Sequence, residues 1–238
     1  MFASLCFLSY NRSEFLEDAF KSALVDPGFP CEVIVHDDGS DPETQYAVGR
    51  ITRDDASLTI FNRVGNNEGV GRAVERTFSL ASGDYLVKID QDLIFNPGWL
   101  KKGIDVIEAD SSVGMVGFFK YPVDPVNWER MQLADGDFSG DGAPRYHYVE
   151  DFVSSVFLIT RDVYETLGSF PQYSDAFAED VEYKNRIKNE LCLNLALLDN
   201  DMVVNRGFGP GPSTIVSQEH EGAEVKVTKI KHGPWVRQ

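Results

Sequence analysis

The sequence has few cysteines, and they follow no regular spacing. Its 238 residues include three, Cys6, Cys31 and Cys192. An odd, widely spaced set does not match a disulfide framework or a cysteine metal site. Each lies within an apolar run, so we expect buried, reduced thiols and a cytoplasmic setting.

Long hydrophobic runs are also missing. No apolar stretch reaches the roughly 20 residues that a helix needs to cross a bilayer. Residues 2–9 form an apolar run that has no basic region before it and becomes polar at Ser9. This pattern predicts a first strand rather than a signal peptide, and we expect no integral membrane segment.

Positive charge is scarce. The chain has 22 Lys and Arg against 38 Asp and Glu, which gives a net charge of −16. Such a chain repels a phosphate backbone, so we expect no nucleic acid partner.

The basic residues Lys226, Lys229, Lys231 and Arg237 gather in 224–238, next to the Gly- and Pro-rich residues 207–212. This C-terminal region predicts either a lid over a diphosphate or a solvated cationic tail, and the two readings stay equal.

The remaining composition is that of a globular protein, with 42% hydrophobic, 25% charged and 12% aromatic residues. The length favours one α/β domain.

Apolar runs predict strands at 2–9, 32–36, 58–61, 85–89, 113–118 and 153–159. Helical spacing or start signals predict helices over 14–25 and roughly 70–81, after 97–99, near 161–167, and from 178. Gly83 is expected to act as a C-cap of the helix before it. The alternation over the first hundred residues predicts a mostly parallel, Rossmann-like half.

Three acidic clusters lie where a predicted strand ends or a helix begins. They are Asp37 with Asp38, Asp90 with Asp92, and Glu179 with Asp180. Alternate residues of a strand share a face, so Asp90 and Asp92 form a carboxylate pair suited to Mg²⁺ or Mn²⁺. Taken singly, each cluster is also explained as a solvated turn or a helix cap.

Several motifs then follow one another in a characteristic order. They are Ser9-Tyr10-Asn11-Arg12, Asp37-Asp38-Gly39-Ser40-Asp41, Asn67-Glu68-Gly69-Val70-Gly71, Gly83-Asp84-Tyr85-Leu86 leading to Asp90-Gln91-Asp92, and Leu167-Gly168-Ser169-Phe170-Pro171 before Ala178-Glu179-Asp180-Val181-Glu182. In this order they resemble the inverting family 2 glycosyltransferases. The resemblance spans nearly the whole chain and implies a GT-A fold, an α/β domain with a Rossmann-like, mostly parallel central sheet flanked by helices.

The resemblance implies a pocket for a nucleotide diphosphate sugar, most readily a UDP-sugar. Asp38 is expected to contact the base or ribose and, as a loop acid, to contribute little to stability. Asp90 is expected to contact the donor. The full implied set is Ser9, Asn11, Arg12, Asp38, Asn67, Gly71, Asp90 and Gln91. Gln91 departs from the small or acidic residue that is common at its position in relatives.

The same resemblance implies a metal and a base. Asp92 is the implied direct ligand of Mn²⁺ or Mg²⁺. Asp180 is the implied catalytic base, kept ionised at a helix start, with Glu179 holding the acceptor or the helix start. Relatives often supply a third ligand, a histidine, where this chain has Asn205, so His220 is the candidate in its place.

Together these features predict one domain over 1–238, with a nucleotide-sugar-binding half over about 1–100 and an acceptor half with a C-terminal lid over about 101–238. The predicted activity is metal-dependent, inverting transfer of a sugar to a glycan, a protein or a small molecule. A catalytically silent sugar-nucleotide or glycan binding module is the alternative, and the presence of both Asp92 and Asp180 argues against it. A nucleotidyltransferase would show a Gly-rich, basic phosphate loop near the N-terminus, which this sequence lacks.

Overall fold

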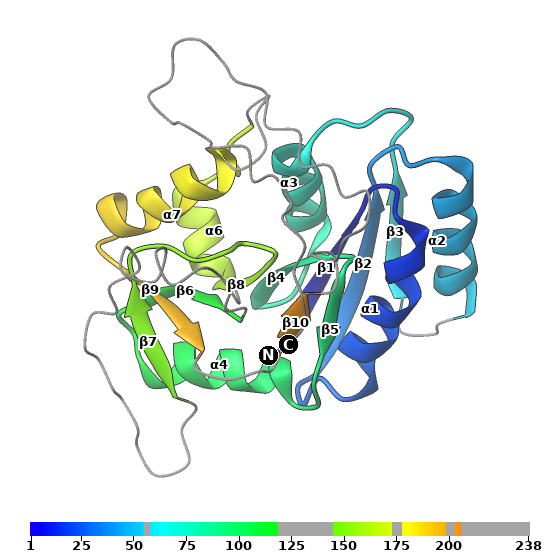
Figure 1. Ribbon diagram of the computed structural model, residues 1–238. Coiled ribbons are helices and arrows are strands. Elements are labelled where there is room, and N and C mark those ends of the chain that lie inside the picture. The colour runs from blue at the N-terminus through cyan, green and yellow to red at the C-terminus, as the bar shows by residue number, and fades with distance from the viewer. Residues whose placement is uncertain (55–57, 119–144, 173–177, 199–202, 206–238) are drawn as a thin grey trace, which may run out of the picture.

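The computed structural model describes residues 1–54, 58–118, 145–172, 178–198 and 203–205 (Figure 1). The helices are α1 (Ser13–Val25), α2 (Pro42–Asp54), α3 (Val70–Leu80), α4 (Trp99–Ala109), α6 (Arg161–Leu167) and α7 (Ala178–Glu190). The strands are β1 (Ala3–Ser9), β2 (Cys31–Asp37), β3 (Leu58–Arg63), β4 (Tyr85–Asp90), β5 (Leu93–Phe95), β6 (Val113–Gly117), β7 (Tyr146–Val149), β8 (Val156–Thr160), β9 (Asn194–Leu198) and β10 (Val203–Asn205).

One sheet of eight strands organises the described part of the chain. Its order is β3-β2-β1-β4-β8-β6-β9-β7. The pairs β3/β2, β2/β1, β1/β4 and β6/β9 are parallel, whereas β4/β8, β8/β6 and β9/β7 are antiparallel. A second, two-stranded sheet pairs β10 with β5. The predicted α/β class with a mostly parallel central sheet is confirmed.

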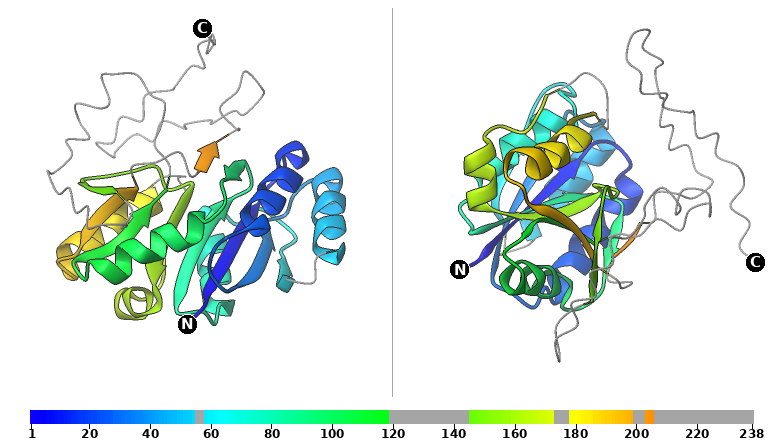
Figure 2. Two further views of the ribbon diagram at one scale, coloured as in Figure 1. Left: turned by 90° about the horizontal axis from the view of Figure 1, so that it is seen from below. Right: turned by 90° about the vertical axis from the view of Figure 1, so that its left-hand side faces the viewer.

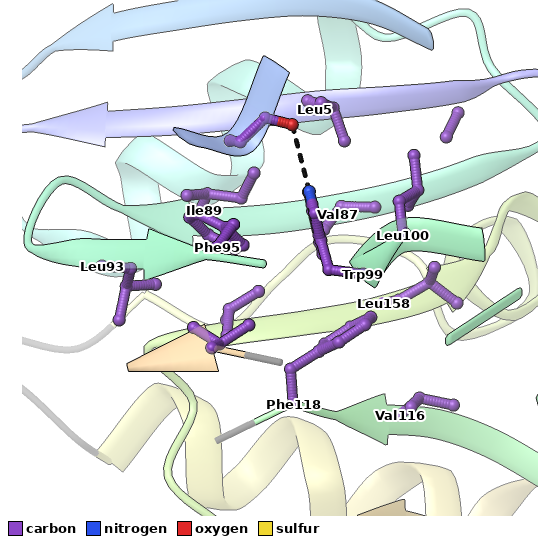
Figure 3. Packing of buried hydrophobic residues seen from close by; sticks show 14 of the residues in the cluster. Leu5, Val87, Ile89, Leu93, Phe95, Trp99, Leu100, Val116, Phe118 and Leu158 are labelled. Atoms are coloured by element: carbon purple, nitrogen blue, oxygen red, sulfur yellow. Dashed lines mark hydrogen bonds between the residues drawn. The ribbon is translucent and has the colours of Figure 1, made fainter. Parts of the chain in front are cut away.

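Helices cover both faces of the large sheet (Figures 1 and 2). One hydrophobic cluster includes residues of α1, α2 and α4, and the other includes residues of α3, α6 and α7. Strand β1 serves both clusters because its side chains alternate: Leu5 and Phe7 join the first, while Cys6 and Leu8 join the second. Figure 3 shows Trp99 in the first cluster, where its indole N–H donates to the Ala23 carbonyl at 3.0 Å.

The structure adds elements that the sequence pattern did not reveal. Helix α2 is not among the predicted helices, although Asp41 caps it by accepting a hydrogen bond from the Thr44 amide at 2.8 Å. Strands β5, β7 and β9 were also missed, because runs of three to five residues give little periodic signal.

The expected C-cap role of Gly83 is wrong. Helix α3 ends at Leu80, and its cap residue Ala81 has a φ of −69°. A Cβ at Gly83 would lie 2.8 Å from the backbone of Ala3 and of Ser4. Glycine is needed here because the chain passes close to β1, not because a helix ends.

The prediction of three buried thiols is only partly confirmed. All three cysteines are free, as expected, and Cys6 is buried while Cys31 is half-buried. Cys192 is exposed, because it follows the end of α7 in a surface turn where its φ is 56°. Among the described helices, none combines the length and the apolar character that a membrane crossing requires.

Candidate active site

A cavity of about 400 Å³ opens at the carboxyl ends of β1, β2 and β4. The parallel register places Ser9 beside Asp37 and Leu8 beside Asp90, so polar residues that follow three separate strands meet at one edge of the sheet. The cavity is lined by Leu8, Ser9, Tyr10, Arg12, Asp38, Asn67, Gly69, Val70, Ala73, Asp90, Gln91, Asp92 and Glu179.

Asp38 joins two loops of the cavity wall. Its side chain is buried, and its two carboxylate oxygens accept the backbone amides of Glu68 at 2.9 Å and Gly69 at 3.0 Å. The adjacent Gly39 has a φ of +74°, and a Cβ there would lie 2.5 Å from the backbone of Asn66. The loop after β2 and the loop before α3 therefore interlock, with Asp38 at their junction.

The loop between β1 and α1 has an unusual backbone. Asn11 and Arg12 both have positive φ values, 53° and 60°, which non-glycine residues seldom adopt. The Gln91 side chain accepts the Tyr10 amide at 3.2 Å and donates to the carbonyls of Tyr10, at 3.1 Å, and of Asn11. Gln91 thus holds this loop, a role that the sequence motif did not show.

Asn11 takes part in the wall without lining the cavity. Its backbone amide donates to Ser40 Oγ at 2.9 Å, and its side-chain Oδ1 accepts a hydrogen bond from the Asp41 backbone amide at 2.8 Å. The implied residues Ser9, Arg12, Asp38, Asn67, Asp90 and Gln91 do line the cavity, whereas Gly71 does not. A Cβ at Gly71 would lie 2.3 Å from the Pro171 carbonyl oxygen, so this glycine permits a close helix approach.

Arg12 faces the cavity with part of its hydrogen-bonding capacity unused. Its Nη1 lies 3.0 Å from Asp92 Oδ2, and its guanidinium group lies over the Phe15 ring at 4.7 Å. Within the described residues, the buried Arg12 Nη2 and Ser9 Oγ have no hydrogen-bond partner. Buried polar atoms are normally paired, so both atoms point to a polar or anionic ligand in the cavity.

Asp90 lies next to a buried cation. Lys88 Nζ is 2.6 Å from Asp90 Oδ1, and the Lys88 side chain is only 2% exposed. Although a third of the Asp90 side chain is exposed, burial of its carboxyl group raises its pKa to about 6. Lys88 opposes that rise, while the charges of Asp92 and Asp180 add to it. A carboxylate with this environment favours a cationic partner.

Glu179 and Asp180 lie in the first turn of α7. Glu179 is buried and lines the cavity, whereas Asp180 does not line it. We expected the helix start to keep Asp180 ionised, but burial raises its pKa, against the effects of Lys88 and Lys184. Desolvation therefore acts against the helix end at this residue, and an ionised Asp180 stays a prediction.

Asp90 and Asp92 suit a divalent metal that also binds a ligand phosphate. Among the described residues no three acids, histidines or cysteines lie close enough to form a metal cluster by themselves. Mg²⁺ is commonly held by one or two carboxylates together with substrate phosphates, so a carboxylate pair at the cavity wall fits it. The candidate third ligand His220 and the lid or solvated tail predicted for 224–238 next to 207–212 lie outside the described residues.

Comparison with known proteins decides the family. Residues 4–168, more than half of the chain, match the family described as Glycosyl transferase family 2. The chain belongs to glycosyl transferase family 2. The family resemblance that the sequence motifs suggested is therefore confirmed.

Individual relatives of this family 2 chain share about a quarter of its residues over the matched regions. It is 27% identical over 172 residues to a dolichol-phosphate mannosyltransferase of Pyrococcus furiosus, which covers 69% of this chain and 48% of that protein. It is 25% identical over 115 residues to an uncharacterized glycosyltransferase of a Nostoc species, which covers 48% of this chain and 35% of the relative. The chain thus spans half or less of the length of these relatives.

A solved structure supports the GT-A fold. The mannosyltransferase PcManGT from Pyrobaculum calidifontis, in complex with GDP-Man and Mn²⁺, superposes with a TM-score of 0.63 at 20% sequence identity. The match covers 82% of this chain and 56% of that one. The architecture of the family 2 chain is therefore that of a GT-A glycosyltransferase.

Proposed function

We propose that this chain binds a nucleotide diphosphate sugar in the cavity and transfers the sugar to an acceptor hydroxyl group with inversion. One observation carries the proposal: Asp90 and Asp92 line the same cavity as Ser9 and Arg12, whose Oγ and Nη2 atoms have no hydrogen-bond partner. The two carboxylates can bind a metal cation, and the neighbouring N–H and O–H groups can donate to an anion. In a family 2 chain this combination suits a metal-bound diphosphate.

The donor end of the cavity is formed by the two interlocked loops. Asp38 and Asn67 are proposed to face the base and ribose, and Arg12 the diphosphate. The sequence favours a uridine nucleotide, whereas the solved relative binds GDP-Man, so the choice of base is open to experiment. The acceptor is proposed to be a glycan, a protein or a small molecule, and a cytoplasmic location stays a prediction.

Asp92, with Asp90 beside it, is proposed to hold Mn²⁺ or Mg²⁺. When bound there, such an ion neutralises the charge that develops on a leaving diphosphate. Arg12 pairs with Asp92, and its unpartnered Nη2 is proposed to donate to a phosphate oxygen in addition. Gln91 keeps the backbone that carries Arg12 in its strained conformation.

Asp180 is proposed as the general base that takes the proton of the acceptor hydroxyl group. Asp180 is half-buried, and its raised pKa makes its carboxylate a stronger base than that of an ordinary surface aspartate. Glu179, which lines the cavity, is proposed to contact the acceptor or the transferred sugar. A base on the side of the sugar opposite the diphosphate gives a single displacement and hence inversion.

A thermal-shift panel tests this donor proposal. UDP, GDP, UDP-glucose and GDP-mannose are each added to the protein with Mn²⁺, with Mg²⁺ or with EDTA. A ligand stabilises the fold according to its affinity, so at 100 times its Kd a matching nucleotide adds about 2.7 kcal/mol. We expect stabilisation that requires the metal, and loss of that requirement in Asp92→Asn. Equal, metal-independent shifts in both proteins would contradict the assignment.

A further inference from the structure

Three lysines donate hydrogen bonds to alternate carbonyl groups of one segment. Residues 150–155 connect β7 with β8. The contacts are Lys88 Nζ with Ser154 O at 2.7 Å, Lys184 Nζ with Phe152 O at 2.7 Å, and Lys188 Nζ with Glu150 O at 2.9 Å. We call these three lysines and their acceptors the lysine latch. It joins β4 and α7 to the same stretch of backbone.

Two members of the latch are buried. Lys88 is 2% exposed and Lys184 is 3% exposed. An ammonium group out of water is costly unless it is paired and hydrogen-bonded, and each of these has both kinds of partner. Lys88 pairs with Asp90, and Lys184 pairs with Asp151.

The latch leads directly to the proposed base. Asp180, Lys184 and Lys188 recur every four residues along α7 and therefore share one helix face. Burial raises the pKa of Asp180, and Lys88, Lys184 and the Ser154 side chain are the nearby groups that lower it. The carbonyl of the same Ser154 accepts Lys88, which in turn holds Asp90. A chain of neighbouring groups thus connects the base with the donor-facing acid.

We propose that Lys88 and Lys184 are positioning residues, which fix Asp180 relative to Asp90 by holding segment 150–155 between β4 and α7. The inference rests on the proposed function, since it assigns Asp180 to the acceptor and Asp90 to the donor. The two acids belong to different elements, so their separation depends on what connects those elements. Displacement of a reacting group by about 1 Å can lower turnover by about 100-fold.

Lys184→Met is the decisive variant. Methionine fills the space of the lysine side chain without its ammonium group, and the Asp151 side chain that loses its partner is already 54% exposed. Lys184→Arg keeps the charge and serves as the conservative variant. Lys101→Met is the matched control, because Lys101 is a surface lysine of α4 that pairs with Asp105. Lys88→Met is a second, harsher variant, since Asp90 then loses its cation.

Two properties are measured in the full chain with Mn²⁺ and with UDP-glucose and GDP-mannose as donor probes. Calorimetry gives donor affinity, and nucleotide release with water as acceptor gives turnover, at a temperature well below the melting point of every variant. We expect Lys184→Met to keep the donor Kd within about two-fold while kcat falls by about 10- to 100-fold, because only the placement of the base changes. Lys184→Arg should recover most of the loss, and Lys101→Met should match the wild type.

An unchanged kcat in Lys184→Met, with or without a lower melting point, would overturn the inference, since the latch would then be structural only. A large loss of donor affinity would overturn it too, because the lysine would act on the donor instead. Either result leaves the proposed function intact when the wild-type chain binds and turns over a donor. A wild-type chain that neither binds nor hydrolyses any donor overturns the proposed function and the inference with it. If Lys88→Met does not fold, Lys184→Met decides alone.

Discussion

Asp38 shows how one side chain serves both the fold and the candidate site. Its carboxylate accepts two backbone amides of the loop before α3, and it also lines the cavity. The motif Asp37-Asp38-Gly39-Ser40-Asp41 places Asp38 in a loop, and from the sequence an acid in a loop is expected to contribute little to the stability of the fold. The structure changes that expectation, because a buried acceptor that holds two amides leaves both unsatisfied when it is removed.

We therefore predict that Asp38→Ala lowers the free energy of unfolding by about 1–3 kcal/mol and also weakens nucleotide binding. Denaturant unfolding measures the first effect and calorimetry the second. Asp105→Ala, on the surface of α4, is the control and should change stability by no more than about 0.5 kcal/mol. Unchanged stability together with unchanged nucleotide affinity would remove Asp38 from both roles.

At the scale of elements, the approach of α3 to the chain before α7 shapes one wall of the cavity. Gly71 in α3 lies so close to this chain that a Cβ would meet the Pro171 carbonyl oxygen at 2.3 Å and Glu179 Cγ at 2.8 Å. The backbone carbonyl is not the flexible end of a side chain, so a methyl group here requires the two elements to separate. Glu179, which lines the cavity, must then move.

Gly71→Ala is predicted to lower stability by about 1–3 kcal/mol and to weaken donor binding, because overpacking displaces the cavity wall. Gly49→Ala in α2 is the matched control. A Cβ at Gly49 meets nothing within 4 Å, and alanine is the better helix former by about 1 kcal/mol, so this variant should be neutral or more stable. Thermal unfolding of both variants measures the contrast. A Gly71→Ala protein as stable as Gly49→Ala would show that the close approach is not required.

Over the whole molecule, residue patterns predict the helices and strands with regularly spaced apolar residues, and they predict the polar residues at strand ends. The class and the order of the main strands and helices follow from apolar runs, and Asp38, Asp90 and Asp92 follow from their places at strand ends. The family resemblance, and not these patterns, indicates Ser9, Arg12, Asn67 and Gln91. Contacts between distant segments do not follow from such patterns. Gly83 passes close to β1, Gln91 holds the loop after β1, and Lys88 and Lys184 meet at residues 150–155. Each depends on a partner far away in sequence, which local spacing cannot identify.

The protonation of the acids is a second property of the whole fold. A helix start is expected to favour ionised Asp180, yet the surrounding protein raises its pKa. Burial at this position arises from elements that pack around α7, so the sequence near residue 180 contains little information about it. The same holds for Asp90, whose raised pKa reflects burial before any neighbouring charge.

The most direct test of the account is donor turnover by Asp180→Asn. Asparagine keeps the size of the side chain and one acceptor oxygen but cannot take the proton, so donor affinity should hold while turnover falls by about 100-fold or more. Glu179→Gln is the companion variant that separates the two neighbours. NMR of the first product formed by the wild-type chain should show the anomeric configuration opposite to that of the donor. A fully active Asp180→Asn protein, or a retained configuration, would contradict the account.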